Sequence, residues 1–217
     1  MNKKKAIVFD FDGTLIDSLK LEADSMLFAI NSFPNAHLTV EELIKHYGPT
    51  EKGIIKSLVD DSFFNKAYEA FLKYYQKEAP LYKVPIPIIK ALINLKNNPN
   101  ISLFLITGRG KDTLDISLDV NKLNNFFIRE YTGSETGVNK DVSMNKLIDD
   151  FNLKKEDILY IGDTISDINV MNKINVDILS VSYFSSKEYH ELLEIKNNGK
   201  VVSDICMLET YINYYIK

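Results

Sequence analysis

The chain has 217 residues, of which 45% are hydrophobic, with a formal net charge of -4 and an isoelectric point near 5.5. This length suits one large domain or a core with a smaller insert, and the acidic balance argues against nucleic-acid binding. Apolar runs are too short for a transmembrane helix or a signal peptide, which predicts a cytoplasmic protein. The single cysteine, Cys206, excludes an internal disulfide and a cysteine zinc site.

The first predicted element is a buried strand over residues 6–9 that runs directly into Asp10 and Asp12. An unbroken apolar run is typical of a parallel strand, and ligands bind at the carboxyl edge of parallel sheets. Residues two apart in an extended segment point the same way, so both carboxylates are expected to face one site. Their mutual repulsion favours a divalent metal with oxygen ligands. The alternative is an ordinary acidic turn at Asp12-Gly13.

Residues 17–83 are predicted to form an all-helical cap domain that is inserted after the first strand. Apolar residues recur at helical spacing over 19–30, a helix that Pro34 ends, and again over 64–75. A capping box over 39–42 indicates a short helix between these two. The cap is expected to close over the site and exclude water.

From residue 87 onward, strands and helices alternate, which predicts a parallel sheet with helices on both faces. We expect strands over 101–106, 126–131, 158–161, 176–181 and 201–202, and helices over 87–96, 111–122, 144–151, 165–171 and 204–216. The first strand belongs to the same sheet. The fold class is therefore α/β, a Rossmann-like parallel sheet core of residues 1–16 and 84–217 with the inserted helical cap.

Polar residues follow the ends of the predicted strands. Thr107 and Gly108 follow the second strand, Asp163 follows the fourth, and Asp167 lies four residues further on. Lys140 lies in the loop after the third strand, just before a helix. Parallel strands end at one edge of a sheet, so these side chains are expected to gather near the first two acids.

Four segments together resemble the motifs of the haloacid dehalogenase superfamily. They are DFDGT at 10–14, LITG at 105–108, Lys140, and GDTISD at 162–167. The resemblance covers essentially the whole chain and is closest to the phosphoglycolate phosphatase-like branch, which has a helical cap after the first strand. It implies a Mg²⁺-dependent phosphatase that hydrolyses a small phosphomonoester through an aspartyl-phosphate intermediate.

The resemblance also implies catalytic roles. Asp10 is the implied nucleophile, and Asp12 is the acid that protonates the leaving oxygen and then accepts a proton from water. Thr107, Gly108 and Lys140 are the implied phosphate-binding groups. Thr107 could instead only cap the next helix, and Lys140 could be a solvated loop residue. Lys146 is a rival for the motif lysine, because no proline follows Lys140.

The implied metal ligands are Asp10, the backbone carbonyl of Asp12, and Asp163, which suit the oxygen ligation of Mg²⁺. Asp167 is expected to hold a metal-bound water or to orient Lys140. The alternative is that Asp167 is an exposed helical acid.

Specificity for the leaving group is expected to come from the cap loop 46–52, with Tyr47, Thr50 and Lys52 as candidates, and from Arg109. Arg109 could equally form a surface salt bridge. Phosphoglycolate, pyrophosphate and a nucleoside monophosphate are the candidate substrates of a monomer or homodimer. A sugar-phosphate mutase and a non-catalytic binding protein are the alternatives. The pair of acids in the first motif favours phosphoryl transfer over dehalogenation.

Overall fold

The structure, a computed structural model, describes residues 5–33 and 37–216, so the predicted helix end at Pro34 lies outside the described residues. Within these residues, six parallel strands form one sheet in the order β3-β2-β1-β4-β5-β6. The strands are β1 (Lys5–Phe9), β2 (Ile101–Ile106), β3 (Arg129–Tyr131), β4 (Ile158–Gly162), β5 (Asp177–Val181) and β6 (Val201–Val202). The first strand therefore lies in the middle of the sheet, and the predicted α/β fold class is confirmed.

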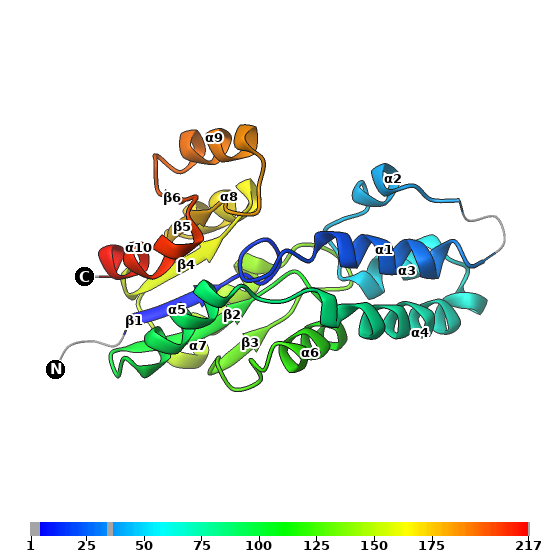
Figure 1. The fold of residues 1–217 in the computed structure, drawn as a ribbon, viewed down its shortest axis with the longest axis horizontal. Coiled ribbons are helices and arrows are strands. Elements are labelled where there is room, and N and C mark those ends of the chain that lie inside the picture. Colours follow the sequence, from blue (N-terminus) through cyan, green and yellow to red (C-terminus); the bar gives the residue numbers. More distant parts are fainter. Residues whose placement is uncertain (1–4, 34–36, 217) are drawn as a thin grey trace.

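Helices cover both faces of this sheet (Figure 1). One face packs against α5 (Ile86–Asn97), α6 (Lys111–Val120) and α10 (Leu208–Tyr215), and the other against α7 (Lys140–Phe151), α8 (Ile165–Lys173) and α9 (Lys187–Lys196). In β1, Ile7 and Phe9 enter the first apolar cluster, and Ala6 and Val8 enter the second. Successive side chains of a strand point to opposite faces, so a strand covered on both sides must be apolar throughout.

Several boundaries differ from the sequence predictions. The third strand is shorter than expected, and Lys140 is the first residue of α7 rather than a loop residue. Helix α9 was not predicted, because its sequence is mostly charged and buries only Leu193. The predicted terminal helix is divided into a 3₁₀ turn, η3 (Ile205–Met207), and α10. Another 3₁₀ turn, η2 (Lys155–Asp157), precedes β4.

Most of the segment between β1 and β2, up to α5, forms a group of helices at one end of the molecule, on the right in Figure 1. They are α1 (Leu19–Ile30), α2 (Val40–Ile44), α3 (Glu51–Leu58), α4 (Asp61–Glu78) and the 3₁₀ turn η1 (Ala79–Leu81). Their apolar faces share a third cluster, which includes Met26, Phe71 and Tyr75. The predicted capping box at Thr39 and Glu42 is present. We call this group the helical cap, and its status as a separate domain stays a prediction.

The helical cap is held against the core by polar contacts from α3 and α4. The Thr50 N–H donates to the Ser134 carbonyl at 2.9 Å, and Lys52 pairs with Glu135 at 2.7 Å. The Tyr68 hydroxyl donates to Asp112 at 2.8 Å. The cap is therefore closed on the loops that follow β2 and β3. Among the described residues, every helix is too short or too polar to span a membrane.

The two-sided burial of the strands predicts a large cost for truncation in β2. Leu105 is fully buried, so Leu105→Ala should lower the free energy of unfolding by about 2–5 kcal/mol in urea titrations. Leu81, which is 75% exposed, provides the control, and Leu81→Ala should change the unfolding free energy by less than about 0.5 kcal/mol. Equal effects of the two substitutions would contradict the described packing.

Candidate active site

Asp10 continues β1 by one residue and is held at the carboxyl edge of the sheet. Its N–H donates to the Ile161 carbonyl at 2.8 Å, which extends the pairing with β4. The Phe11 N–H donates to its Oδ1 at 2.7 Å, and the Lys140 Nζ donates to its Oδ2 at 2.5 Å. The Asp10 carboxylate is thus oriented by one neutral donor and one cation, and the residue is only 4% exposed.

Asp163 reaches the same point from the end of β4, and its position depends on Gly13. The turn after β1 places Gly13 at φ 72°, a conformation that side chains disfavour. A Cβ at Gly13 would lie 2.0 Å from the Asp163 Oδ2, so the absent side chain makes room for this carboxylate. The Thr14 hydroxyl donates to the Asp163 Oδ1 at 3.1 Å. The first and fourth motifs are therefore packed against each other.

Asp167 lies beneath these two acids on the first turn of α8 and is fully buried, so it is not an exposed helical acid. Its Oδ2 accepts from the N–H and hydroxyl of Thr164 in a capping box. Its Oδ1 accepts from Lys140 at 2.7 Å and from the Tyr160 hydroxyl at 3.2 Å. Lys140 therefore bridges Asp10 and Asp167, whereas Lys146 pairs with Asp150 on an exposed face of α7.

Asp10, Asp163 and Asp167 form a group whose oxygen atoms lie within 4.8 Å of one another. Lys140 neutralises only part of this charge. Burial, with the charge of Asp167, raises the pKa of Asp10 to about 7 against the pull of Lys140. Burial and the charges of Asp10 and Asp167 raise the pKa of Asp163 well above its usual range, although Lys140 opposes this. This excess of buried carboxylate oxygen fits a hard divalent cation such as Mg²⁺.

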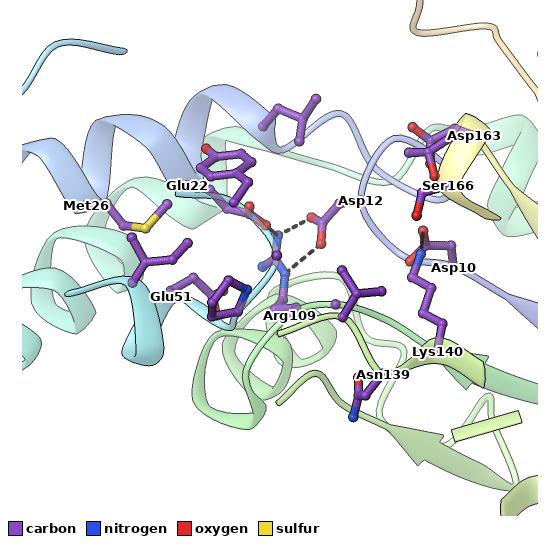
Figure 2. Close-up of a pocket in the computed structure, with 18 residues that line it drawn as sticks. Asp10, Asp12, Glu22, Met26, Glu51, Arg109, Asn139, Lys140, Asp163 and Ser166 are labelled. Carbon is purple, nitrogen blue, oxygen red and sulfur yellow. Dashed lines mark hydrogen bonds and ion pairs between the residues drawn. The ribbon is translucent and has the colours of Figure 1, made fainter. Parts of the chain in front are cut away.

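Asp12 points away from that group and toward Arg109, as Figure 2 shows. The Arg109 guanidinium forms a two-point ion pair with it, with Nε donating to Oδ2 at 3.1 Å and Nη2 to Oδ1. The Ser18 hydroxyl also donates to Asp12. Burial alone would raise the pKa of Asp12, but Arg109 and these hydrogen bonds hold it below its usual value.

Arg109 is itself buried and ties the core to the helical cap. Its Nη2 donates to Glu22 on α1 at 2.7 Å, and its Nη1 donates to Tyr75 on α4 and to Ser117 on α6. Its side chain is 0% exposed, so it does not form the surface salt bridge that sequence reasoning allowed. Burial and the charge of Asp12 raise the pKa of Glu22 well above its ordinary value, although Arg109 opposes this.

Glu22 and Glu51 are two buried acids that the sequence analysis did not single out. Glu51, on α3, accepts from the Gly110 N–H at 2.8 Å and from the Thr113 hydroxyl at 2.5 Å, at the N-terminus of α6. Acidic residues in helices are usually exposed, so their type alone gave no signal. The spacing of Glu22 four residues after Ser18 places both on one face of α1, which was the available clue.

These residues line one cavity of about 420 Å³ between the core and the helical cap (Figure 2). The core contributes Asp10, Asp12, Gly108, Arg109, Val138, Asn139, Lys140, Asp163, Thr164 and Ser166, and the cap side contributes Leu19, Glu22, Met26, Tyr47, Gly48, Pro49, Glu51 and Ile54. Both acids of the first motif therefore reach a common space. Asn139 and Ser166 are further polar lining residues that sequence reasoning missed.

Four of the predicted site residues do not line this cavity. Asp167 lies behind Lys140, and Thr107 is buried, with its hydroxyl accepting from the Arg109 N–H at 3.2 Å. Thr50 caps the N-terminus of α3, and Lys52 pairs with Glu135 outside the cavity. Of the candidate specificity residues, Tyr47 and Arg109 line it.

Comparison with known families agrees with the motifs and their arrangement. A family model described as haloacid dehalogenase-like hydrolase matches residues 7–181, which include every acid of the first and fourth motifs. The chain belongs to this haloacid dehalogenase-like hydrolase family. The resemblance stated from the four motifs is thereby confirmed, and this family member is an enzyme of the hydrolase class.

Its relatives include phosphatases of small molecules. The phosphoglycolate phosphatase of Aquifex aeolicus is 24% identical over 166 residues, which cover 76% of this chain and 78% of the relative. The pyrophosphatase PpaX of Oceanobacillus iheyensis is 24% identical over 185 residues, covering 82% and 84%.

Solved structures of the family share the whole fold. A predicted phosphatase from Clostridium acetobutylicum superposes with a TM-score of 0.74 at 24% identity, covering 98% of this chain and 99% of that chain. A candidate beta-phosphoglucomutase from Thermotoga maritima gives a TM-score of 0.70 at 17% identity, covering 97% and 99%. At these identities the structures show a common fold, and the site must be argued from its own residues.

The contact between Gly13 and Asp163 gives a test of the acid group. Gly13→Ala should cost about 1–2 kcal/mol of stability from its positive φ and should also displace the Asp163 carboxylate. We therefore expect the rise in melting temperature that Mg²⁺ produces in the unaltered protein to be lost. Gly199 has a similar φ of 76° with open space around it, so Gly199→Ala should show the backbone cost and keep the Mg²⁺ effect. A retained Mg²⁺ effect in Gly13→Ala would argue against Asp163 as a ligand.

The buried ion pairs of Arg109 give a second test. Arg109→Met leaves Asp12 and Glu22 without their cation, so the free energy of unfolding at neutral pH should fall by about 3–5 kcal/mol. Arg129→Met, at an exposed position, should change it by less than about 0.5 kcal/mol. Urea titration measures both values, and a near-neutral Arg109→Met would show that the two acids do not depend on this cation.

Proposed function

We propose that this enzyme is a Mg²⁺-dependent phosphatase that hydrolyses a small phosphomonoester through an aspartyl-phosphate on Asp10. The observation that supports the proposal most directly is that two acids, each paired with a different cation, line opposite sides of one cavity. Asp10 lies beside Lys140 and the other motif acids, and Asp12 lies on the cap side beside Arg109. The family membership and the names of the relatives agree with this reaction class.

In the proposed first step, an oxygen of Asp10 attacks phosphorus as the bond from phosphorus to the leaving oxygen breaks. The leaving oxygen takes a proton from Asp12 and departs as an alcohol. In the second step, Asp12 accepts a proton from water as that water attacks the aspartyl-phosphate, which releases phosphate and restores Asp10. Lys140, 2.5 Å from the Asp10 Oδ2, supplies positive charge beside the transferring group.

Asp12 must be protonated for the first step and ionised for the second. The ion pair with Arg109 favours the ionised form, which suits the second step. We therefore expect the contact between Asp12 and Arg109 to loosen when a substrate enters the closed cavity. Arg109 would in that way set when Asp12 carries its proton.

Asp10 and Asp163, with the backbone carbonyl of Asp12, are the proposed ligands of Mg²⁺, and Asp167 is proposed to hold a metal-bound water and to orient Lys140. The ion would offset the repulsion between these carboxylates and the phosphate when bound. The Thr107 hydroxyl and the backbone N–H groups around Gly108 are proposed to bind phosphate at the end of β2. The proposal further includes a cytoplasmic location and a monomer or homodimer.

The mutase alternative is not favoured by a specific observation. A mutase must protect the aspartyl-phosphate from water while its product turns around, and the sequence shows no histidine or lysine just after Thr14 for that task. The resemblance to a candidate mutase structure is at 17% identity and concerns the fold alone.

The proposal predicts that Asp10→Asn removes turnover and leaves the fold intact. Phosphate release should be measured with Mg²⁺ on p-nitrophenyl phosphate and on a panel of phosphorylated metabolites, and should fall by at least about 10³-fold. Circular dichroism checks the fold. Asp115→Asn, at an exposed position paired with Lys111, is the matched control and should keep full activity. Turnover retained by Asp10→Asn would refute the nucleophile assignment.

A further inference from the structure

The cap-side half of the cavity is unusual in its charge. We define this half by Glu22, Met26, Tyr47, Glu51, Ile54 and Arg109. Two of these residues are carboxylates and one is a cation. The other half is lined by Asp10, Lys140 and Asp163, and we call it the phosphate-binding half after the proposed function. Asp12 lies at the border between the two halves and pairs with Arg109. Two carboxylates, those of Asp12 and Glu22, therefore pair with one guanidinium, and Glu51 adds a third buried carboxylate to this half of the cavity.

The N–H donors of the Arg109 guanidinium are already used in hydrogen bonds within the protein. Its Nε and Nη2 donate to Asp12 and Glu22, and its Nη1 donates to Tyr75 and Ser117. Its guanidinium also lies 5.2 Å from the centre of the Phe11 ring, which covers part of its face. A ligand carboxylate or phosphate could bind Arg109 only by displacing one of the enzyme's own buried carboxylates.

The other cation of the cavity, Lys140, is also paired with carboxylates of the protein. Lys140 lies in the phosphate-binding half and donates to both Asp10 and Asp167. Among the described residues that line the cavity, Arg109 and Lys140 are the two with positive side chains. The N-terminus of α6 offsets part of the charge of Glu51. Asp12, Glu22 and Glu51 nevertheless outnumber Arg109, and these neighbouring carboxylates add to burial in raising the pKa of Glu22.

The geometry of the proposed reaction places the leaving group in this half. Phosphorus must approach Asp10 in the phosphate-binding half, and the leaving oxygen must approach Asp12 on the opposite side. The rest of the leaving group then extends toward Glu22 and Glu51, in the part of the cavity that Met26 and Ile54 also line. Like charges brought together in a desolvated site are strongly disfavoured, and opposite charges are selected.

We infer that the substrate is a phosphomonoester whose leaving group carries a positive charge, such as the phosphate ester of a short amino alcohol. This inference rests on the proposed function for the direction of the leaving group. The ammonium would lie between the carboxylates of Glu22 and Glu51. Substrates with an anionic leaving group, such as the monoester phosphoglycolate and the anhydride pyrophosphate, would be rejected by the same two side chains.

Three phosphonates of equal length test the charge preference without any turnover. They are 3-aminopropylphosphonate, 3-hydroxypropylphosphonate and 3-phosphonopropionate, whose far ends are cationic, neutral and anionic. Calorimetric titration into the unaltered protein with Mg²⁺ should give affinity in that order, with at least about 100-fold between the first and last. Equal affinities, a reversed order, or no binding of the aminophosphonate would overturn the inference.

The corresponding esters test the same preference in turnover. The expected order of kcat/KM is phosphoethanolamine, then 2-hydroxyethyl phosphate, then phosphoglycolate. If phosphonate binding follows charge but none of the esters nor p-nitrophenyl phosphate is hydrolysed, the proposed function fails and the charge preference stands. If p-nitrophenyl phosphate is hydrolysed and phosphoglycolate exceeds phosphoethanolamine, the charge preference fails and the phosphatase stands.

The substitution Glu22→Gln tests whether Glu22 causes the preference for a positively charged ligand. It keeps a hydrogen-bond acceptor for Arg109 and removes the carboxylate that a bound ammonium would hold in its ionised form, so the affinity ratio of the cationic to the anionic phosphonate should fall at least tenfold. Glu69→Gln, on the exposed face of α4 where Glu69 pairs with Lys73, is the control and should leave the ratio unchanged. An unchanged ratio in folded Glu22→Gln would remove Glu22 from the proposal.

Discussion

The site depends on ion pairs between two buried cations and a larger number of buried carboxylates, with each cation paired to its own group of acids. A carboxylate can be buried only when a cation, hydrogen bonds or a proton compensates it, and here Lys140 and Arg109 supply the positive charge. Lys140 holds Asp10 and Asp167 together below the phosphate-binding half. Arg109 holds Asp12 and Glu22 together below the helical cap. Each group contains more carboxylates than cations, and burial together with this imbalance raises the pKa of Asp10, Asp163 and Glu22.

The imbalance has different consequences in the two halves. Around Asp10 the acids come from β1, β4 and α8, and their oxygen atoms are close enough to share one metal ion. Around Arg109 the acids come from the core and from two cap helices, and separate donors bind them: Arg109 donates to Asp12 and Glu22, whereas Gly110 and Thr113 at the N-terminus of α6 donate to Glu51. A bound metal ion would compensate the first group of acids. The second is completed by a cationic ligand or by a proton, which ties closure of the cap to the charge of what it encloses.

The sequence predicted the parts of this arrangement that arise from strand ends. Asp10, Asp163 and Asp167 follow buried apolar runs, and a parallel sheet brings such positions to one edge whatever the intervening chain does. Glu22 and Glu51 could not be found in this way, because their burial depends on how the helices pack across the core. The same reason explains Arg109, whose buried position is set by α1 and α4 rather than by its neighbours in sequence. Helix α9 was missed because half of its residues are charged and Leu193 is its buried residue, so the sequence shows no continuous apolar face.

The relatives named for phosphoglycolate and pyrophosphate share this fold at 24% identity, yet those leaving groups are anionic. A fold of this kind fixes the phosphate-binding half through its strand ends, whereas the cap side is built from helices whose lining can change without disturbing the sheet. In this chain Glu22 and Glu51 come from α1 and α3, and both reach into the cavity because the cap is docked through contacts of its own, at Thr50 and Tyr68. The cap helices can therefore change the residues that face the leaving group without moving the strand ends that hold Asp10. This separation between core and cap permits members of the family to share one reaction and to differ in the leaving group that they accept.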